Sequence, residues 1–308
     1  MARDKFNFNL DYASMFKYFI TASVIMMIGF GTLFFTKGLN YGVDFRGGAE
    51  IQVALKNKVA LSEVRTSLDG LSIPISSVQS IGSEEGKEFL IKVQTDQGDL
   101  NKVSTEMKDV LATKFGAENV EILKNDIVGP KAGAQLRNSA FQAMAWALLA
   151  IMIYLSLRFD YKYAPGAIAA LLHDVLFMTG MFILTQKEFT LQIVAALLAI
   201  IGYSVNDTVV IYDRVRELED ENTTGKPMNV ILNNAINETM SRTILTAGTV
   251  FSVCACMLVF GGNVIEDFAF AMVLGTISGT YSTIFIASPI TILLDKMQGG
   301  KQAPPVKA

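Results

Sequence analysis

Charged and polar residues interrupt the apolar segments of this 308-residue chain at three places. His173 and Asp174 occur in the run ALLHDVLFMTG, Asn206 and Asp207 in GYSVNDTVVIYDR, and Arg242 in MSRTILTAG. An ionisable group in hydrocarbon costs at least about 2.5 kcal/mol, and such groups are usually kept for an ion or proton pathway. These five residues are therefore the candidate functional residues.

Asp207 and Arg242 suggest proton chemistry. If the two segments are antiparallel helices joined by a cytoplasmic loop, both residues lie at a similar depth, and we expect them to form an ion pair. A carboxylate with a single Arg partner is either ion-paired or protonated, and protonation releases the Arg to another partner. Such a pair can couple proton passage to helix movement, with Asn206 as its polar neighbour.

Asp174 has two interpretations that the sequence leaves open. It can belong to the same proton pathway, or it can be a static polar group that holds helices together through hydrogen bonds. His173 beside it could satisfy it or could face another subunit. Asp213, beside Arg214 and Arg216, is expected to be a solvated residue at the membrane boundary.

Several other chemistries are not indicated. His173 is the only histidine, so this chain cannot supply a multi-histidine metal site. Cys254 and Cys256 are two positions apart on an expected helix and point to different faces, which excludes a disulfide between them. The chain has no G-x-x-x-x-G-K-[ST] nucleotide motif. We expect no cofactor, with protons as the coupling ion, no enzymatic activity and no nucleic-acid partner.

The composition of the chain indicates what kind of secondary-structure element carries these residues. Hydrophobic residues make up 51% of the chain and charged residues only 18%, against about 25% charged in soluble domains. Six segments approach the roughly 20 apolar residues that a membrane-crossing helix needs. They cover residues 16–35, 141–157, 165–184, 189–211, 244–260 and 268–290. The sequence predicts a polytopic α-helical membrane protein with six transmembrane helices.

The first apolar segment is longer than the core of a signal peptide and lacks a small-x-small cleavage site, so we interpret it as a retained anchor. Basic residues near short loops favour the cytoplasm. With a cytoplasmic N-terminus, twelve basic residues face inside, whereas the two short outer turns carry only Lys187. The twelve are Arg3, Lys5, Lys17, Arg158, Lys162, Arg214, Arg216, Lys226, Arg242, Lys296, Lys301 and Lys307. Both termini are therefore predicted to be cytoplasmic.

Residues 37–140 contain 13 basic and 14 acidic residues, which is an ordinary proportion for a soluble domain. Period-two and helical patterns alternate there in the order β-α-β-β-α-β, with strands at 49–55, 78–81, 89–93 and 120–127 and helices at 61–71 and 100–115. This order predicts an extracytoplasmic α+β ferredoxin-like domain between helices 1 and 2. The expected domains are thus 1–36, 37–140, 141–297 and a cytoplasmic tail, 298–308.

Two glycine patterns accompany these elements. Gly275 and Gly279 give the sixth helix a small-xxx-small face, extended by Ser278 and Ser282, that permits close helix contact. The run YGVDFRGG at 41–48 places two glycines after Asp44, Phe45 and Arg46. It is interpreted first as a turn into the sheet, and alternatively as a contact surface for a partner or a hinge of the outer domain.

Several motifs together resemble the SecD/SecF family of bacterial protein-export membrane proteins, in the resistance-nodulation-division superfamily. They are the D-F-x-G-G signature (Asp44, Phe45, Gly47 and Gly48), VGPKAGAQL, LLHDV, GYSVNDTVVIYDRVRE and SRTILTAGT. The resemblance spans most of the chain in the family's order.

The resemblance implies a SecF-like subunit that works with SecD, supplied as a separate polypeptide, and with the SecYEG channel. Such a unit assists export of preproteins across the bacterial inner membrane with proton-motive force. YajC is a further possible partner, and membrane lipid surrounds the helices. The family's proton-relay positions correspond here to Asp207 and Arg242, and less directly to Asn206, His173 and Asp174.

Two other functions are compatible with parts of the pattern. An intramembrane aspartyl protease would use Asp174 and Asp207, but no G-x-G-D motif occurs. A small-molecule proton-coupled exporter of the same superfamily usually carries both six-helix halves and two large outer domains on one chain.

Overall fold

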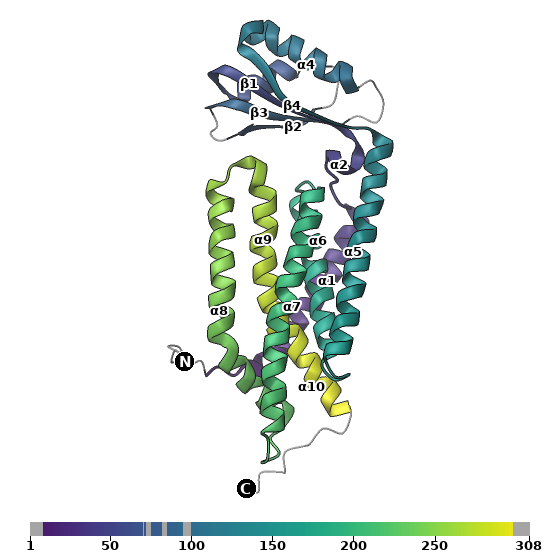
Figure 1. Ribbon diagram of the computed structural model, residues 1–308, viewed down its shortest axis with the longest axis vertical. Coiled ribbons are helices and arrows are strands. Elements are labelled where there is room, and N and C mark those ends of the chain that lie inside the picture. Colours follow the sequence, from purple (N-terminus) through teal and green to yellow (C-terminus); the bar gives the residue numbers. More distant parts are fainter. Residues whose placement is uncertain (1–8, 70, 72–74, 82–84, 95–99, 298–308) are drawn as a thin grey trace.

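The computed structural model describes residues 9–69, 71, 75–81, 85–94 and 100–297. A small α+β domain stands at one end of a bundle of long helices, and α10 (Ser288–Met297) lies at the opposite end (Figure 1). The expected tail, 298–308, lies outside the described residues.

The six expected membrane helices are confirmed, since six helical stretches in the described part of the chain are long and apolar enough to cross a bilayer. The helices are α1 (Tyr12–Thr36), α5 (Pro130–Arg158), α6 (Ala164–Thr185), α7 (Leu191–Asp220), α8 (Met228–Phe260) and α9 (Asn263–Ser282), which continues through a π-helical stretch (Thr283–Ala287) into α10 (Ser288–Met297). Helices α5, α7 and α8 extend well past the apolar segments, because hydropathy marks only the part that can lie in hydrocarbon, whereas backbone hydrogen bonding continues into polar sequence.

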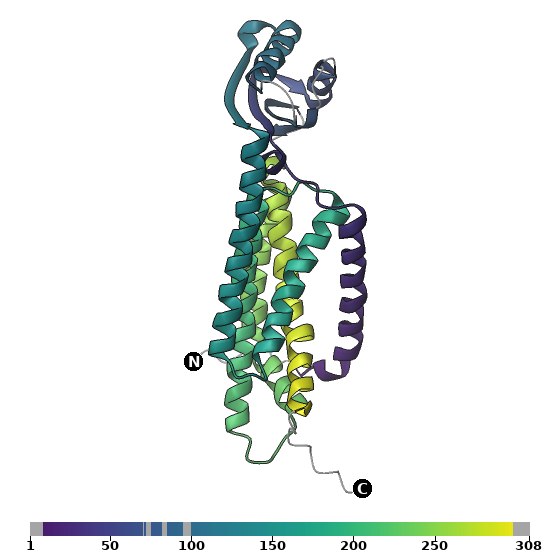
Figure 2. The same ribbon diagram turned by 90° about the vertical axis from the view of Figure 1, so that its right-hand side faces the viewer.

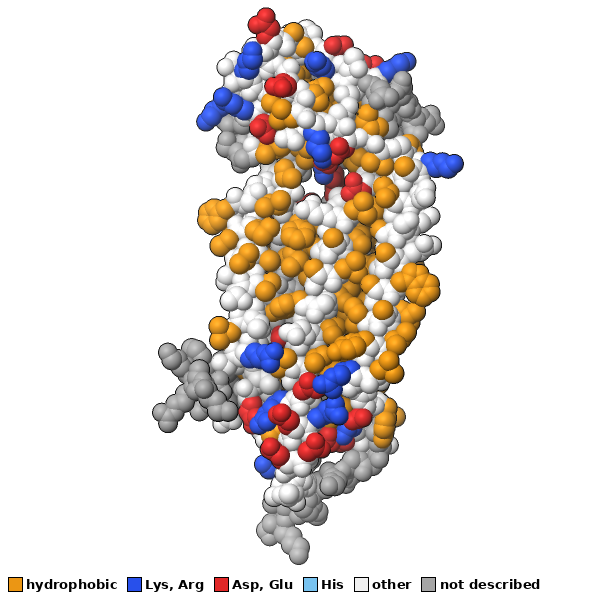
Figure 3. Space-filling model, in the orientation of Figure 1, with side chains coloured by type: hydrophobic (Ala, Val, Ile, Leu, Met, Phe, Trp, Pro, Cys, Tyr) orange, Lys and Arg blue, Asp and Glu red, His pale blue; other side chains and the backbone are white. Residues whose placement is uncertain are grey.

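The centre of the bundle is formed by α6, α7 and α9. In α6, in α7 and in the helix that runs from α9 into α10, half of the residues in the most apolar 18-residue stretch are buried. The corresponding share in α1, α5 and α8 is only 6–11%. A turned view shows α1 along one side of the bundle and α5 rising from the far end up to the outer domain (Figure 2). Hydrophobic side chains cover the middle of the surface, and charged side chains gather at both ends (Figure 3). This distribution is the one expected of a protein whose middle lies in lipid.

The outer domain contains the predicted β-α-β-β-α-β order. Its elements are β1 (Gly48–Ala60), α3 (Leu61–Leu68), β2 (Ile75–Ile81), β3 (Glu85–Val93), α4 (Leu100–Phe115), a 3-10 turn (Ala117–Asn119) and β4 (Val120–Val128). The strands form one antiparallel sheet in the order β2-β3-β1-β4, in which Ile51 pairs with Ile91 and with Asn125. The sheet therefore has the ferredoxin-like arrangement.

Alternation along the strands directs one face of the sheet onto the two helices. Ile51, Phe89 and Ile91 are fully buried there against Met107 and Leu111 of α4. Before the sheet, α2 (Val43–Arg46) forms one helical turn between α1 and β1. The expected turn in YGVDFRGG is thus a short helix that ends at Gly47, where the backbone has φ +93°.

Candidate functional site

Asp174 of α6 lies at the centre of the bundle with only 1% of its surface exposed. Three hydroxyl groups donate hydrogen bonds to its carboxylate: Ser204 Oγ of α7 at 2.6 Å, and Ser278 Oγ and Ser282 Oγ of α9 at 2.6 and 2.8 Å. Asp174 therefore joins the three central helices through one side chain. All three donors are neutral, and each gains an acceptor that hydrocarbon could not supply.

His173 is buried beside Asp174, but the two do not form a hydrogen bond. Its Nδ1 lies 3.6 Å from Asp174 Oδ1, which is too long for one. Neither ring nitrogen has a hydrogen-bond partner among the described residues. The ring stacks on Phe177 and lies against Tyr281, at centroid distances of 6.3 and 5.7 Å.

Asp207 of α7 is 3% exposed, and its environment differs from that of Asp174. Within the described part of the chain, its Oδ2 is buried and has no hydrogen-bond partner. The expected ion pair with Arg242 is not formed. Every ion pair found among the described residues joins other groups. The side chain of Arg242 leaves α8 on an exposed face.

Asn206 is also exposed, although its neighbours Asp207 and Thr208 are buried. On α8, Thr243 follows Arg242 and is 2% exposed, and its hydroxyl is unpaired among the described residues. Asp207 and Thr243 are therefore buried in the bundle, whereas Asn206 and Arg242 lie on its outer surface. Polar side chains on the surface of a membrane bundle usually face a partner or a water-filled space.

Gly275 and Gly279 bring α9 close enough to α7 for this arrangement. A Cβ added to Gly275 would collide with the side chain of Ile200, and one added to Gly279 would lie 3.0 Å from Ser204 Cβ. The glycines and the serines Ser278 and Ser282 alternate along the buried side of α9. The close approach therefore brings both serine hydroxyls to Asp174.

The two carboxylates can do different chemistry. The carboxylate of Asp174 accepts three hydrogen bonds from hydroxyl groups, whereas Asp207 Oδ2 accepts none among the described residues and can take a proton without losing a hydrogen bond. An aspartyl protease dyad needs two carboxyl groups that share a proton. Among the described residues, Asp207 Oδ2 has no hydrogen-bond partner, Asp174 included. The geometry does not support a protease.

The family-motif residues lie away from this centre, at the junction of the two parts. Asp44 Oδ2 accepts a hydrogen bond from Leu191 N at the start of α7, at 3.1 Å, and Phe45 is 1% exposed. A Cβ on Gly47 would lie 2.7 Å from Pro130 Cα, and one on Gly48 would collide with the carbonyl of Val93. Both glycines are therefore required by close backbone packing.

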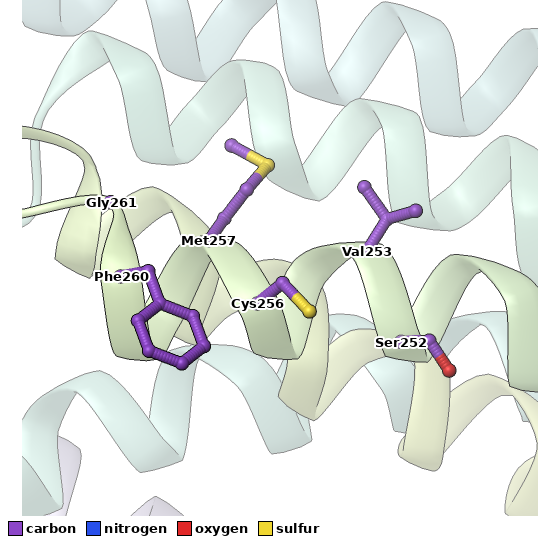
Figure 4. Close-up of a pocket in the computed structure, with 6 residues that line it drawn as sticks. All are labelled: Ser252, Val253, Cys256, Met257, Phe260 and Gly261. Carbon is purple, nitrogen blue, oxygen red and sulfur yellow. The ribbon is translucent and has the colours of Figure 1, made fainter.

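The remaining sequence expectations have clear positions. Asp213 lies within α7 and forms an ion pair with Arg158 at 2.7 Å, so it is not merely solvated. Cys254 is buried and Cys256 exposed, and both are free. A shallow apolar pocket on α8 includes Ser252, Cys256 and Phe260 but no ionisable carboxylate or amine (Figure 4). Among the described residues, no group of three or more His, Cys, Asp or Glu side chains could hold a metal.

The sequence pattern does not mark the serine donors of Asp174 as functional residues. Ser278 and Ser282 enter it only as small residues of the sixth helix, and Ser204 does not enter it. A usable signal was present, because Ser278 and Ser282 share a helix face at a spacing of four and Ser204 and Asp207 at a spacing of three. What the sequence lacked was the helix order that places both faces opposite Asp174.

Six membrane helices around buried carboxylates, with an α+β domain outside the bundle, define a multi-pass membrane protein of the transport class. Comparisons with known proteins identify the family. The model "Protein export membrane protein SecD/SecF, C-terminal" matches residues 107–297, and the "SecD/SecF GG Motif" matches residues 32–59. The chain belongs to the SecD/SecF family and is a subunit of the Sec protein translocation machinery.

Relatives and solved structures agree. The chain is 40% identical to the protein translocase subunit SecF of Calditerrivibrio nitroreducens, over 94% of this chain and 95% of that protein. It is 41% identical to SecF of Magnetococcus marinus, over 92% and 88% of the two chains. The crystal structure of SecDF from Thermus thermophilus, described as a translocon-associated membrane protein, matches with a TM-score of 0.79 and 30% identity. That match covers 96% of this chain but only 40% of the SecDF chain.

Proposed function

We propose that this subunit couples proton movement to protein export, with Asp207 as the group that binds and releases the proton. The supporting observation is the unpaired, buried Oδ2 of Asp207 on the central helix α7. The buried carboxylate of Asp174 on α6, in contrast, accepts three hydrogen bonds. Arg242 on the neighbouring helix α8 forms no ion pair among the described residues. It is therefore available as the counter-charge of Asp207, and a change in the protonation of Asp207 would change that attraction.

The required partner is a SecD-type chain that covers the exposed polar face of α7 and α8. Asn206 and Arg242 lie on this face, and a Cβ added to the nearby Gly202 or Gly248 would meet no atom of the described chain within 4 Å. Small residues with a polar neighbour favour helix association in membranes. The solved SecDF chain is longer, and this chain matches only 40% of it, which leaves a part that could correspond to such a partner. We infer association of this unit with the SecYEG channel and the exported preprotein, and YajC is a further candidate.

We further propose a location in the bacterial inner membrane with both termini in the cytoplasm. The support is the strong bias of basic residues toward the segments at the helix ends opposite the outer domain. The outer domain would then face the extracytoplasmic side. We propose no enzymatic activity and no cofactor other than the proton.

The test is the variant Asp207→Asn in the complex with its SecD-type partner, reconstituted with the translocation channel in vesicles. Asn keeps the size of the side chain but cannot titrate, so the part of late-stage export that depends on a proton gradient should disappear. Folding and partner binding should be retained.

Asp213→Asn is the matched control, because Asp213 lies on the same helix but is ion-paired with Arg158 at the bundle end. Gradient-dependent export should persist in this variant. Full gradient dependence in Asp207→Asn would contradict the proposal. Drug extrusion by the isolated chain would instead favour a small-molecule exporter.

A further inference from the structure

The segment before the outer domain is bonded to the turn between α6 and α7. Gly42 N donates to Phe189 O at 3.0 Å, and Phe189 N donates to Asn40 O at 2.7 Å. The side chain of Asn40 also donates to Gln186 O at 2.9 Å. These bonds join two parts of the chain that are almost 150 residues apart in sequence, as the parallel pairing of Tyr41 with Phe189 shows.

Asp44 extends this pairing to the first turn of α7. The natural cap position, Thr190, makes no side-chain capping hydrogen bond within the described chain. Instead Asp44 Oδ2 accepts from Leu191 N at 3.1 Å. A carboxylate at a helix N-terminus satisfies a free backbone N–H and interacts favourably with the helix dipole. Asp44 is therefore the cap of a helix to which it does not belong.

The same segment is fixed to the outer domain. Arg46 Nη1 donates to Gln94 Oε1 at 3.1 Å, just past β3, and Gln94 Nε2 donates to Tyr41 O at 3.4 Å. Gly47 and Gly48 pack on the backbones of Pro130 and Val93, which leaves no space for a side chain at either position. The segment is thus held on one side by the sheet and on the other by α7.

Asp207 lies on α7 sixteen residues after Leu191, or about 24 Å along the helix at 1.5 Å per residue. The structure shows α7 as one unbroken α-helix over this span, and no proline occurs between Leu191 and Asp207, so the helix has no proline kink there. A displacement of α7 at Asp207 would therefore reach Leu191 and, through it, the carboxylate of Asp44.

We propose that Asp44 is a positioning residue that transmits movement of α7 to the outer domain. This inference rests on the proposed function, since it assumes that α7 shifts when Asp207 changes protonation state. It also selects among the interpretations of YGVDFRGG: the run is a joint within this chain rather than a free turn or a surface for a partner.

The experiment measures the position of the outer domain directly. Spin labels are placed on Lys108→Cys of α4 and Phe260→Cys at the end of α8, both exposed positions, in a chain with Cys254→Ala and Cys256→Ala. Pulsed electron resonance then gives the distance between the labels in the partner-bound, reconstituted protein. Asp207 is compared with Asp207→Asn, which imitates the protonated state.

With Asp44 intact, the mean distance should shift by several ångströms between the two Asp207 states. Asp44→Ala should abolish this shift, and Asp44→Asn should restore it, because Asn also caps helices. Asp11→Ala is the control: Asp11 caps α1 by accepting from Ser14 N at 3.2 Å, at the other end of the bundle. In that variant the shift should remain.

An equal label distance in both Asp207 states with Asp44 intact would overturn the inference, and so would a full shift in Asp44→Ala. The proposed function fails by a different result, namely gradient-dependent export that persists in Asp207→Asn. Export assays on the Asp44 variants add a second readout. Asp44→Ala should lose gradient-dependent export while proton uptake into the vesicles continues, whereas parallel loss of both would indicate only a damaged α7 and overturn the inference.

Discussion

Among single residues, the two buried carboxylates that the structure describes differ in their hydrogen bonding. Asp174 accepts hydrogen bonds from Ser204, Ser278 and Ser282, whereas Asp207 has a buried oxygen with no partner among the described residues. A buried polar group with complete hydrogen bonding stabilises one arrangement, and an unpaired one is costly and usually kept for function. These differences favour a stabilising role for Asp174 and support the proposal that Asp207 exchanges the proton.

The role of Asp174 predicts the effect of removing one donor. Ser278→Ala should lower the free energy of unfolding by about 1 kcal/mol, the usual size of an interhelical hydrogen bond in a membrane. Unfolding in mixed detergent micelles measures this difference. In an Asp174→Ala background the same substitution should have almost no effect, since the acceptor is already absent.

Ser252→Ala provides the control. Its hydroxyl donates to Gly248 O of its own helix at 2.7 Å on an exposed face, so its removal should leave the unfolding free energy nearly unchanged. Equal losses for Ser278→Ala with and without Asp174 would show that the serine acts by packing and not through the carboxylate.

At the scale of elements, glycines on α9 decide how the central helices meet. Gly275 lies against Ile200 of α7, and Gly279 lies against Ser204. Membrane helices gain little from hydrophobic burial against one another, so close packing and hydrogen bonds must hold them together. The α7–α9 contact supplies both, because the glycines permit the approach and the serines beside them reach Asp174.

Gly275→Ala should therefore destabilise the bundle. The added methyl group would displace the Ile200 side chain, and overpacking of this kind costs about 1 to 3 kcal/mol. Ile200→Ala in the same chain should recover part of the loss. The measurement is again the free energy of unfolding in detergent.

Gly248→Ala is the matched control on α8, since no described atom lies within 4 Å of the position that its Cβ would occupy. Its stability should be equal to or slightly above that of the native chain, because Ala favours helices over Gly. If Gly275→Ala and Gly248→Ala behaved alike, the close α7–α9 contact would not be a determinant of stability.

In the molecule as a whole, an ion pair links the outer domain to the bundle. Lys92 of β3 donates to Glu188 in the α6–α7 turn at 2.8 Å, and Glu50 of β1 lies 3.8 Å from the same ammonium group. Burial alone would lower the pKa of Lys92, but the hydrogen bond and charge of Glu188 raise it above its ordinary value. Burial has the opposite effect on a carboxyl group, and it raises the pKa of Glu50 above its ordinary value.

Glu188→Gln should loosen this contact. It removes a charge-assisted hydrogen bond from a largely buried lysine, at a cost of about 2 kcal/mol to the outer domain. Urea unfolding of that domain, followed by hydrogen exchange of the β3 amides, measures the loss. Glu121→Gln, on the exposed part of β4, should have little effect.

The pH dependence has a definite direction. Because the folded pKa of Lys92 lies above its unfolded value of about 10.4, its contribution is complete below that value and disappears as pH rises through the folded pKa. The stability difference between the native chain and Glu188→Gln should therefore stay constant from neutral pH to about 10 and then decline. A difference already lost at pH 8 would show that Lys92 is not the group involved.

The six membrane helices, the order of the outer-domain elements, and Asp174 and Asp207 as charged residues inside the bundle could be predicted from the sequence alone. Each of these follows from local pattern: apolar length, period-two or helical alternation, and the cost of charge in hydrocarbon. The close packing at Gly275 and Gly279 was also visible as a small-residue face, although its partner helix was not.

Which of these groups contact one another follows only from the tertiary structure. It separated Arg242 from Asp207, supplied Asp174 with serines from two other helices, and placed Asp44 on a helix almost 150 residues further along the chain. The physical reason is that hydrogen bonds and ion pairs act over about 3 to 4 Å, whereas sequence patterns specify only the face of an element. Which faces are opposed depends on the packing of all the helices together.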